Sequence, residues 1–209
     1  DDRRRSFLTT KTPLRDHTRA VSGVLTSSLA ITAHKRTEEH LRYLAHHDPL
    51  TSLPNRTLLS EKLRGAIARA RRGDKIFALH LIDLDGFKAV NDVYGHSVGD
   101  RFLQGIGGRL REVVRERDTL ARLGGDEFAI LQSDVGSNYD VAEFSARICE
   151  AIAAFTDPET PQMKSTASIG VAIHPNDGAD PEEMLRNADL AMYKAKAEGG
   201  NAYCLFAAD

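Results

Sequence analysis

The sequence has no tryptophan and only two cysteines, Cys149 and Cys204, which are isolated from each other. Without a CxxC pair or a Cys/His cluster, neither a disulfide framework nor a structural zinc site is predicted, and a reducing cytosol is indicated. No charge of one sign dominates, because 28 Lys and Arg residues stand against 30 Asp and Glu residues. With a formal net charge of −2, the chain has no overall basic field that would favour nucleic acid as a partner.

Long hydrophobic runs are also absent. The least polar long stretch, residues 21–33, is rich in Ser and Thr and too short to span a bilayer, and no signal peptide is seen. The content of 41% hydrophobic and 28% charged residues is typical of a globular protein. Since the chain begins at Asp1 without methionine, we expect a cytoplasmic segment of a longer protein, with any membrane tether outside this segment.

The most informative stretch, residues 122–128, reads RLGGDEF and continues into an apolar segment. Gly124 and Gly125 permit a tight turn and a close approach of a ligand to the backbone. Asp126 and Glu127 are adjacent carboxylates, which would be costly to bury without a partner. Such a pair fits a hard cation that holds a phosphate substrate. The alternative interpretation is a surface hairpin with a solvated acidic turn.

A second acidic segment follows the apolar run at residues 75–82, which predicts a strand buried on both faces. Asp83, Leu84 and Asp85 end this strand beside a glycine, the place where α/β-type sheets carry their chemistry. Further strands are predicted over residues 165–173 and 202–206, and helical spacing predicts helices over residues 57–72, 98–115, 139–155 and 181–197.

Several spaced motifs occur in one order, namely DxDxFKxxND, YGHxxGD, GGDEF, SIGVA and YKAKxxGGN, beginning at residues 83, 94, 124, 168 and 193. With these motifs the chain resembles the GGDEF family of diguanylate cyclases over about residues 41–206. The resemblance implies an α+β fold similar to nucleotidyl-cyclase and polymerase-palm domains, in which helices flank a mainly antiparallel sheet.

Diguanylate cyclases join two GTP molecules into cyclic di-GMP, as a 3′-hydroxyl attacks an α-phosphate and pyrophosphate leaves. By motif position, the resemblance implies that Mg²⁺, with Mn²⁺ as an alternative ion, is bound by Asp83, the Leu84 carbonyl, Asp126 and Glu127. Two such ions can stabilise the attacking and leaving oxygens. The resemblance also implies a catalytic set in which Asp126, assisting deprotonation of the 3′-hydroxyl, acts with Glu127 and Lys88.

The resemblance further implies a substrate-binding set made of Phe87, Lys88, Asn91, His96, Asp100, Gly124, Gly125 and Lys196. Lys88 and Lys196 would contact phosphate as point charges. Asn91 and Asp100 match the family's guanine readers, and a carboxylate can accept from the guanine N1–H and 2-amino groups, which adenine lacks. The alternative role for these two residues is helix capping and turn formation.

Arg115 and Asp118 form an RxxD segment with five residues between Asp118 and Gly124. This offset matches the family's product-inhibition site, where arginine can bind a guanine or a phosphate bidentately, and Arg147 is a further candidate for it. The alternative is a solvated helix end whose cations favour the helix dipole.

One position departs from the family pattern. Gly200 stands where the family commonly has arginine, so a phosphate contact would be missing and GTP binding would be weaker. Two alternatives to an active cyclase therefore stay open. One is a GTP-binding regulatory domain attached to a phosphodiesterase, and the other is a receptor that only binds cyclic di-GMP.

The domain organisation predicted from sequence has three parts. Residues 1–33 hold two β-rich runs and resemble the last hairpin of a PAS sensor domain, the alternative being a disordered tail. Residues 34–47 resemble a linker helix with a hint of coiled-coil spacing. Residues 48–209 form the cyclase domain. Because each half-site holds one GTP, a homodimer through the linker helix and facing catalytic domains is implied.

Overall fold

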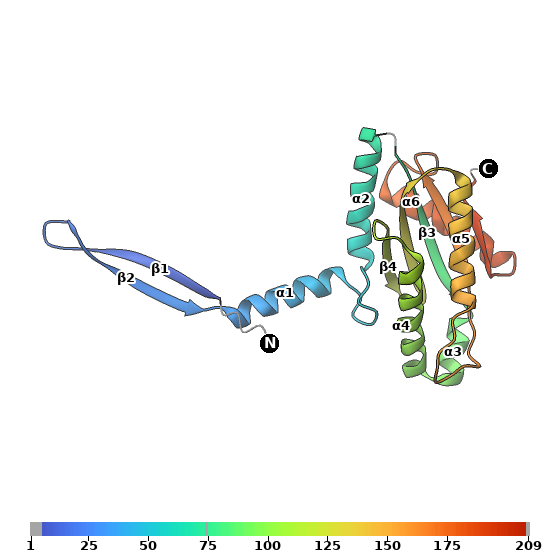
Figure 1. Ribbon diagram of the computed structural model, residues 1–209, viewed down its shortest axis with the longest axis horizontal. Coiled ribbons are helices and arrows are strands. Elements are labelled where there is room, and N and C mark those ends of the chain that lie inside the picture. The colour runs from blue at the N-terminus through green and yellow to red at the C-terminus, as the bar shows by residue number, and fades with distance from the viewer. Residues whose placement is uncertain (1–5, 74, 208–209) are drawn as a thin grey trace. The chain divides into compact units, whose positions relative to one another are not determined.

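The computed structural model describes residues 6–73 and 75–207, and the chain divides into two compact units, Asp1–Ala45 and His46–Asp209. The first unit contains an antiparallel ribbon of β1 (Phe7–Arg15) and β2 (Val21–Ala30), followed by α1 (Thr32–His46), whose last residue belongs to the second unit (Figure 1). The β-rich runs and the helix expected from sequence are therefore observed. None of the described helices is long and apolar enough to cross a membrane.

The ribbon of the first unit has no core of its own, and large apolar side chains remain exposed on it. Its register pairs Leu8 with Leu29 and Thr12 with Leu25, and Leu14 faces Gly23. Since alternate residues of a strand share a face, Leu8, Leu14, Leu25 and Leu29 lie on the same side of the ribbon. We call this side the leucine face.

The second unit is built on a five-stranded sheet in the order β4-β5-β3-β6-β7. Its strands are β3 (Ile76–Asp85), β4 (Thr119–Gly124), β5 (Glu127–Val135), β6 (Thr166–His174) and β7 (Ala202–Leu205). All neighbours pair antiparallel except β6 and β7, which are parallel. The mainly antiparallel sheet implied by the motifs is thus confirmed, and its central strand is the predicted doubly buried run.

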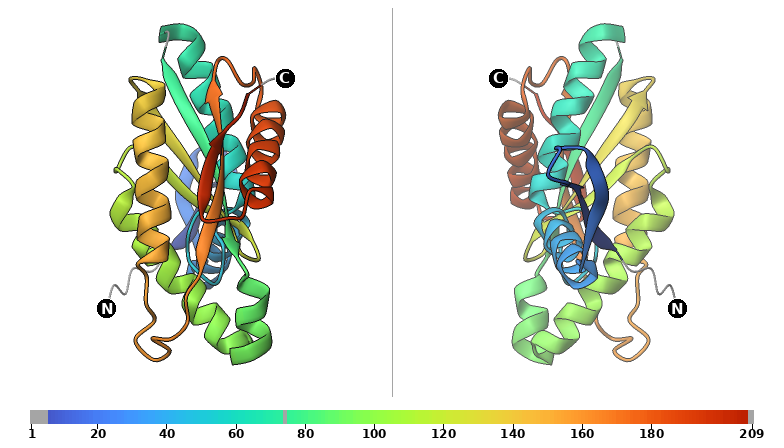
Figure 2. Two further views of the ribbon diagram at one scale, coloured as in Figure 1. Left: turned by 90° about the vertical axis from the view of Figure 1, so that its right-hand side faces the viewer. Right: turned by 90° about the vertical axis from the view of Figure 1, so that its left-hand side faces the viewer.

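Helices cover both faces of this sheet (Figure 2). On one face, α2 (Arg56–Gly73) and α6 (Pro181–Ala197) pack on the odd-numbered residues of β3, such as Leu79 and Leu81. On the other, α4 (His96–Val113) and α5 (Asn138–Ala153) pack on even-numbered residues such as Ile82. All four helices begin and end within two residues of the predicted bounds.

One helix is not among those predicted. α3 (Phe87–Tyr94) lies between β3 and α4 and is bounded by Gly86 and Gly95, both at positive φ (69° and 83°). These conformations suit glycine, so each residue allows a sharp change of chain direction. The DxDxFK motif is therefore split between the end of β3 and the first turn of α3.

Candidate functional site

The acidic residues of the two predicted segments come together at one edge of the sheet. Asp83 near the end of β3 lies directly opposite Glu127 at the start of β5. The Leu84 amide donates to the Asp126 carbonyl at 3.3 Å, which ties the end of β3 to the hairpin turn. Asp83 is only 9% exposed, whereas Asp126 and Glu127 are half-buried. The structure therefore joins the metal ligands expected from sequence, although they lie more than 40 residues apart in the chain.

The turn between β4 and β5 needs both of its glycines. Gly124 and Gly125 have φ values of 134° and 54°, a region that strains residues with a Cβ atom. Both residues are exposed, and a Cβ atom at either would meet no other described atom within 4 Å. The reason for glycine here is thus the backbone conformation, and the open surface leaves room for a ligand against the turn.

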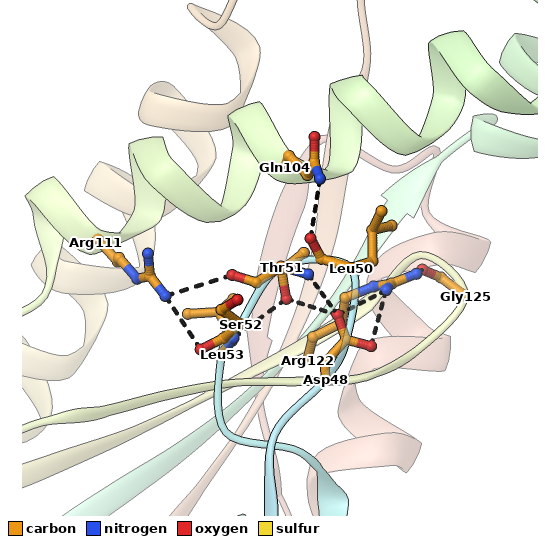
Figure 3. A network of polar contacts seen from close by, with 9 residues as sticks. All are labelled: Asp48, Leu50, Thr51, Ser52, Leu53, Gln104, Arg111, Arg122 and Gly125. Atoms are coloured by element: carbon orange, nitrogen blue, oxygen red, sulfur yellow. Dashed lines mark hydrogen bonds and ion pairs between the residues drawn. The ribbon is translucent and has the colours of Figure 1, made fainter. Parts of the chain in front are cut away.

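Arg122 fixes this turn from inside the protein (Figure 3). Its Nε and Nη2 atoms donate to the Gly125 carbonyl at 3.1 and 2.7 Å, while Nη1 donates to both carboxylate oxygens of Asp48 at 2.9 and 3.0 Å. The Arg122 and Asp48 side chains are only 9% and 14% exposed. A largely buried ion pair therefore connects the loop after α1 to the glycine turn.

Asp48 also organises its own loop. The amide and hydroxyl of Thr51 donate to its Oδ1 atom at 2.8 and 2.7 Å. Burial opposes ionisation of Asp48, but the hydrogen bonds from Thr51 and Arg122 outweigh it and lower the pKa of this carboxyl. Gln104 and Arg111 of α4 donate to carbonyls of the same loop (Figure 3). The sequence analysis assigned no role to Asp48, although the proline-punctuated segment that it opens, Asp48-Pro49-Leu50-Thr51, lies directly after a predicted helix.

Two cations neutralise part of the acidic edge. Lys196 in the last turn of α6 places Nζ 2.8 Å from Asp83 Oδ2, and Arg56 at the start of α2 places Nη2 3.3 Å from Glu127 Oε2. Lys196 is also one of the two lysines that the resemblance implies as phosphate contacts. Arg56 was missed, although its position just after the Pro54-Asn55 step, at a helix start, could have drawn attention to it.

The edge still carries excess negative charge. Burial raises the pKa of Asp83, the hydrogen bond from Lys196 opposes this shift, and the nearby charges of Asp126 and Asp85 add to it. Among the described residues, no three His, Cys, Asp or Glu side chains converge into a ready-made metal site. The donor set nevertheless fits Mg²⁺ chemically, since carboxylates crowded at one edge are relieved by a hard cation.

A pocket of about 410 Å³ adjoins Glu127 on the face covered by α2 and α6. Its floor is apolar, and its polar lining residues are Arg56, Glu127, Arg186 and Asp189. The expected guanine readers do not line it. This pocket therefore offers room beside Glu127 on the opposite side of the sheet from α4.

Of the two expected guanine readers, Asn91 lies on α3 and Asp100 on α4, and these two helices pack on each other. The Asn91 side chain lies so close to Gly99 that a Cβ atom there would overlap Asn91 Oδ1, and Asp100 is the next residue. Neither residue caps a helix, because the N-caps of α3 and α4 are Gly86 and Gly95. The capping alternative is therefore wrong for both. The Asn91 side chain therefore contacts α4 at the residue that precedes Asp100.

The other expected substrate residues differ in exposure. Lys88, His96 and Asp100 are exposed, and within the described part of the chain the side chains of Lys88 and Asp100 have no hydrogen-bond or ion-pair partner. Phe87 is buried, with its ring 6.4 Å from that of Phe102. Of Phe87, therefore, only the backbone is available to a ligand.

The RxxD segment forms a tight turn between α4 and β4. Asp118 accepts from the amides of Arg115 and Ser133 at 3.1 and 3.0 Å, so its carboxylate is used within the fold. Arg115 is exposed and, with Glu116 and Arg117, lines an open hollow of about 460 Å³.

Arg147 of α5 reaches this end of α4. Its Nη2 atom donates to the Val113 carbonyl at 3.3 Å, and its guanidinium lies 5.7 Å from the centre of the Phe144 ring. Val113 is two residues before Arg115, so the structure brings the third candidate of the product-inhibition site to the same region as the first two.

Comparisons with known proteins agree with this fold. A family model described as "Diguanylate cyclase, GGDEF domain" matches residues 45–202. The bifunctional diguanylate cyclase/cyclic di-GMP phosphodiesterase MucR of Pseudomonas aeruginosa is 45% identical over 187 residues, which make up 90% of this chain but only 26% of MucR. The chain thus spans about a quarter of that relative.

Two solved structures are also similar. The GGDEF domain of TpbB from Pseudomonas aeruginosa superposes with a TM-score of 0.74 at 37% identity, covering 78% of this chain and 95% of that one. The coiled coil and GGDEF domain of DgcB from Caulobacter crescentus, in complex with c-di-GMP, gives a TM-score of 0.73 at 27% identity, covering 85% of this chain and 93% of that one.

Proposed function

We propose that this chain, which belongs to the GGDEF family of diguanylate cyclase domains, condenses two GTP molecules into cyclic di-GMP and two pyrophosphates. The observation that carries the proposal is the pairing of Asp83 with Glu127 across β3 and β5, next to a glycine turn that Arg122 holds in place. Acidic side chains and an accessible turn are what a metal-bound triphosphate requires.

The residues have separate tasks in this reaction. Bound Mg²⁺ would supply a Lewis acid that offsets charge on the phosphates, and Asp83, Asp126, Glu127 and the Leu84 carbonyl are the groups to hold it. Asp126 accepts the proton of the 3′-hydroxyl. Lys88 is exposed and without an ion-pair partner among the described residues, and it is suited to bind phosphate.

Incubation of the chain with GTP and Mg²⁺, followed by ion-exchange chromatography, tests the proposal. Cyclic di-GMP and pyrophosphate are expected, at a rate per chain that rises with protein concentration, because the product needs two facing GTP sites. GTP binding without product would instead support the regulatory alternative. Gly200 favours that alternative, and the intact Asp83, Asp126 and Glu127 oppose it. Binding of cyclic di-GMP alone would support a receptor.

Asp100→Ala should weaken GTP binding by about tenfold or more, because the guanine N1–H and 2-amino groups lose their acceptor. ATP lacks these donors, so its affinity, already weaker than that of GTP, should not change. The discrimination between GTP and ATP should therefore fall. Calorimetry with both nucleotides measures this. The control is Glu112→Ala, which removes another exposed carboxylate from α4. Unchanged GTP affinity in Asp100→Ala would remove Asp100 from the guanine site.

Arg115→Ala should keep the initial rate of the wild type but should no longer slow as product accumulates. Arg115 offers product a bidentate guanidinium outside the catalytic edge, so inhibition through it acts on the arrangement of domains rather than on the GTP site. Progress curves with added cyclic di-GMP measure the effect, with Arg109→Ala, which removes an exposed arginine of α4, as the control. Equal inhibition of wild type and Arg115→Ala would leave Arg115 as a solvated residue at a helix end.

We also propose that residues 1–33 are the end of a PAS-like sensor domain and that residues 34–47 form a linker through which two chains dimerise. The leucine face supports the first part, because a two-stranded ribbon with exposed leucines is marginal without further strands or a partner. Leu41 and Leu44, exposed on α1, support the second. A structure of a longer protein in which the leucine face stays uncovered would contradict the sensor assignment.

A further inference from the structure

Asp85 is an acidic residue of the catalytic edge that the proposed chemistry does not use. Its Oδ1 atom accepts from the Ser168 hydroxyl at 2.7 Å, and its Oδ2 atom accepts from the Thr166 hydroxyl at 2.7 Å and the Asn201 amide at 2.9 Å. Both carboxylate oxygens are thus engaged by protein donors. Asp85 is therefore bound to β6 and to the turn between α6 and β7, and it is not placed as a further metal ligand.

The turn that Asp85 holds is built around Gly200. Gly200 has a φ of 74°, and a Cβ atom there would lie 2.9 Å from Asp85 Oδ2. A side chain at this position would meet both backbone strain and the carboxylate. The glycine that departs from the family pattern is thus the residue that lets Asp85 reach the Asn201 amide.

The same turn ends the helix that carries Lys196. The amide of Gly199 donates to the Lys196 carbonyl at 3.2 Å, and that of Gly200 donates to the Ala195 carbonyl at 3.1 Å. Upstream, α6 lies directly on β6, because a Cβ atom at Gly170 would overlap the α6 backbone. α6 therefore packs on β6 and is held at its C-terminal end by the turn. In this position, Lys196 Nζ lies 2.8 Å from Asp83 Oδ2.

We propose that Asp85 is a positioning residue, whose carboxylate anchors residues 199–201 and thereby keeps Lys196 at the phosphate end of the catalytic edge. With glycine in place of the family's arginine, Lys196 is the cation that this segment offers to a triphosphate, and its placement depends on Asp85. The anchoring follows from the contacts of Asp85. Only the identity of the ligand of Lys196 rests on the proposed function.

A double-mutant cycle tests the link between the two residues. The probe is 3′-deoxy-GTP, which lacks the attacking hydroxyl and cannot react, with GMP as the comparison. Asp85→Ala and Lys196→Ala should each weaken 3′-deoxy-GTP about tenfold, and the double variant should show little further loss, because coupled residues are non-additive. GMP affinity should hardly change. Additive losses, or equal losses for GMP, would overturn the proposal.

Hydrogen exchange tests the anchor independently of any nucleotide. Asp85→Ala should speed exchange of the amides of residues 199–201 and of the last turn of α6, with the centre of β3 unchanged. Thr166→Val, which removes one of the donors to Asp85, should give a smaller change in the same direction. Unchanged exchange in Asp85→Ala would overturn the anchoring. If exchange changes but wild type makes no cyclic di-GMP, the anchor stands and the proposed function fails.

Discussion

Glu127→Gln and Asp83→Asn should each abolish formation of cyclic di-GMP while leaving the domain folded. Each change removes an ionised oxygen from the edge where β3 and β5 meet, and an amide is a poor replacement in a Mg²⁺ site. The measurements are turnover by chromatography and Mn²⁺ affinity by titration. We expect loss of product beyond the detection limit and at least about tenfold weaker Mn²⁺ binding, because one charged ligand is gone.

Stability should behave differently from activity in these variants. Burial and neighbouring carboxylates raise the pKa of Asp83, so its charge does not favour the folded state, and Asp83→Asn should keep or raise the melting temperature. The control is Asp189→Asn, which removes an exposed carboxylate from α6 in the same pocket as Glu127. Near-native turnover in Asp83→Asn or Glu127→Gln, with normal folding, would show that the residue concerned is not a metal ligand.

The features of this site that the sequence predicts are those that depend on local sequence patterns. The apolar run before Asp83 predicts a doubly buried strand, and the two glycines before Asp126 predict the turn. That the two acidic segments share one site was implied by the resemblance to the GGDEF family. The helices are predicted well because their apolar residues recur at helical spacing over four turns or more.

What the sequence did not predict depends on contacts between distant segments. Asp48 and Arg122 are 74 residues apart, and only the fold shows that one guanidinium serves both Asp48 and the Gly125 carbonyl. The pairing of Arg56 with Glu127, 71 residues away, was missed for the same reason. The loss of a phosphate contact at Gly200 stays a prediction, and only the fold shows that a Cβ atom there would lie 2.9 Å from Asp85 Oδ2.

Arg122→Met should destabilise the domain by about 3–5 kcal/mol, because it leaves the largely buried Asp48 carboxylate without its cation. For a domain of this size, that corresponds to a fall of about 10 °C in melting temperature. The control is Arg111→Ala. Arg111 contacts the same loop but is exposed, and its hydrogen bonds to the Thr51 and Ser52 carbonyls are long, 3.4 Å each. Its removal should change stability by less than about 0.5 kcal/mol.

Arg122→Lys separates the two tasks of this guanidinium. Lysine keeps a positive charge beside Asp48, so much of the stability should remain, but a single ammonium cannot donate to Asp48 and also place two N–H groups on the Gly125 carbonyl. If this double contact sets the conformation of the glycine turn, turnover in Arg122→Lys should fall at least about tenfold at a temperature where the variant is fully folded, since small misplacements of a catalytic group are costly. Turnover that instead follows the melting temperatures of Arg122→Lys and Arg122→Met would mean that Arg122 only stabilises the fold, and that the glycine turn keeps its shape without it.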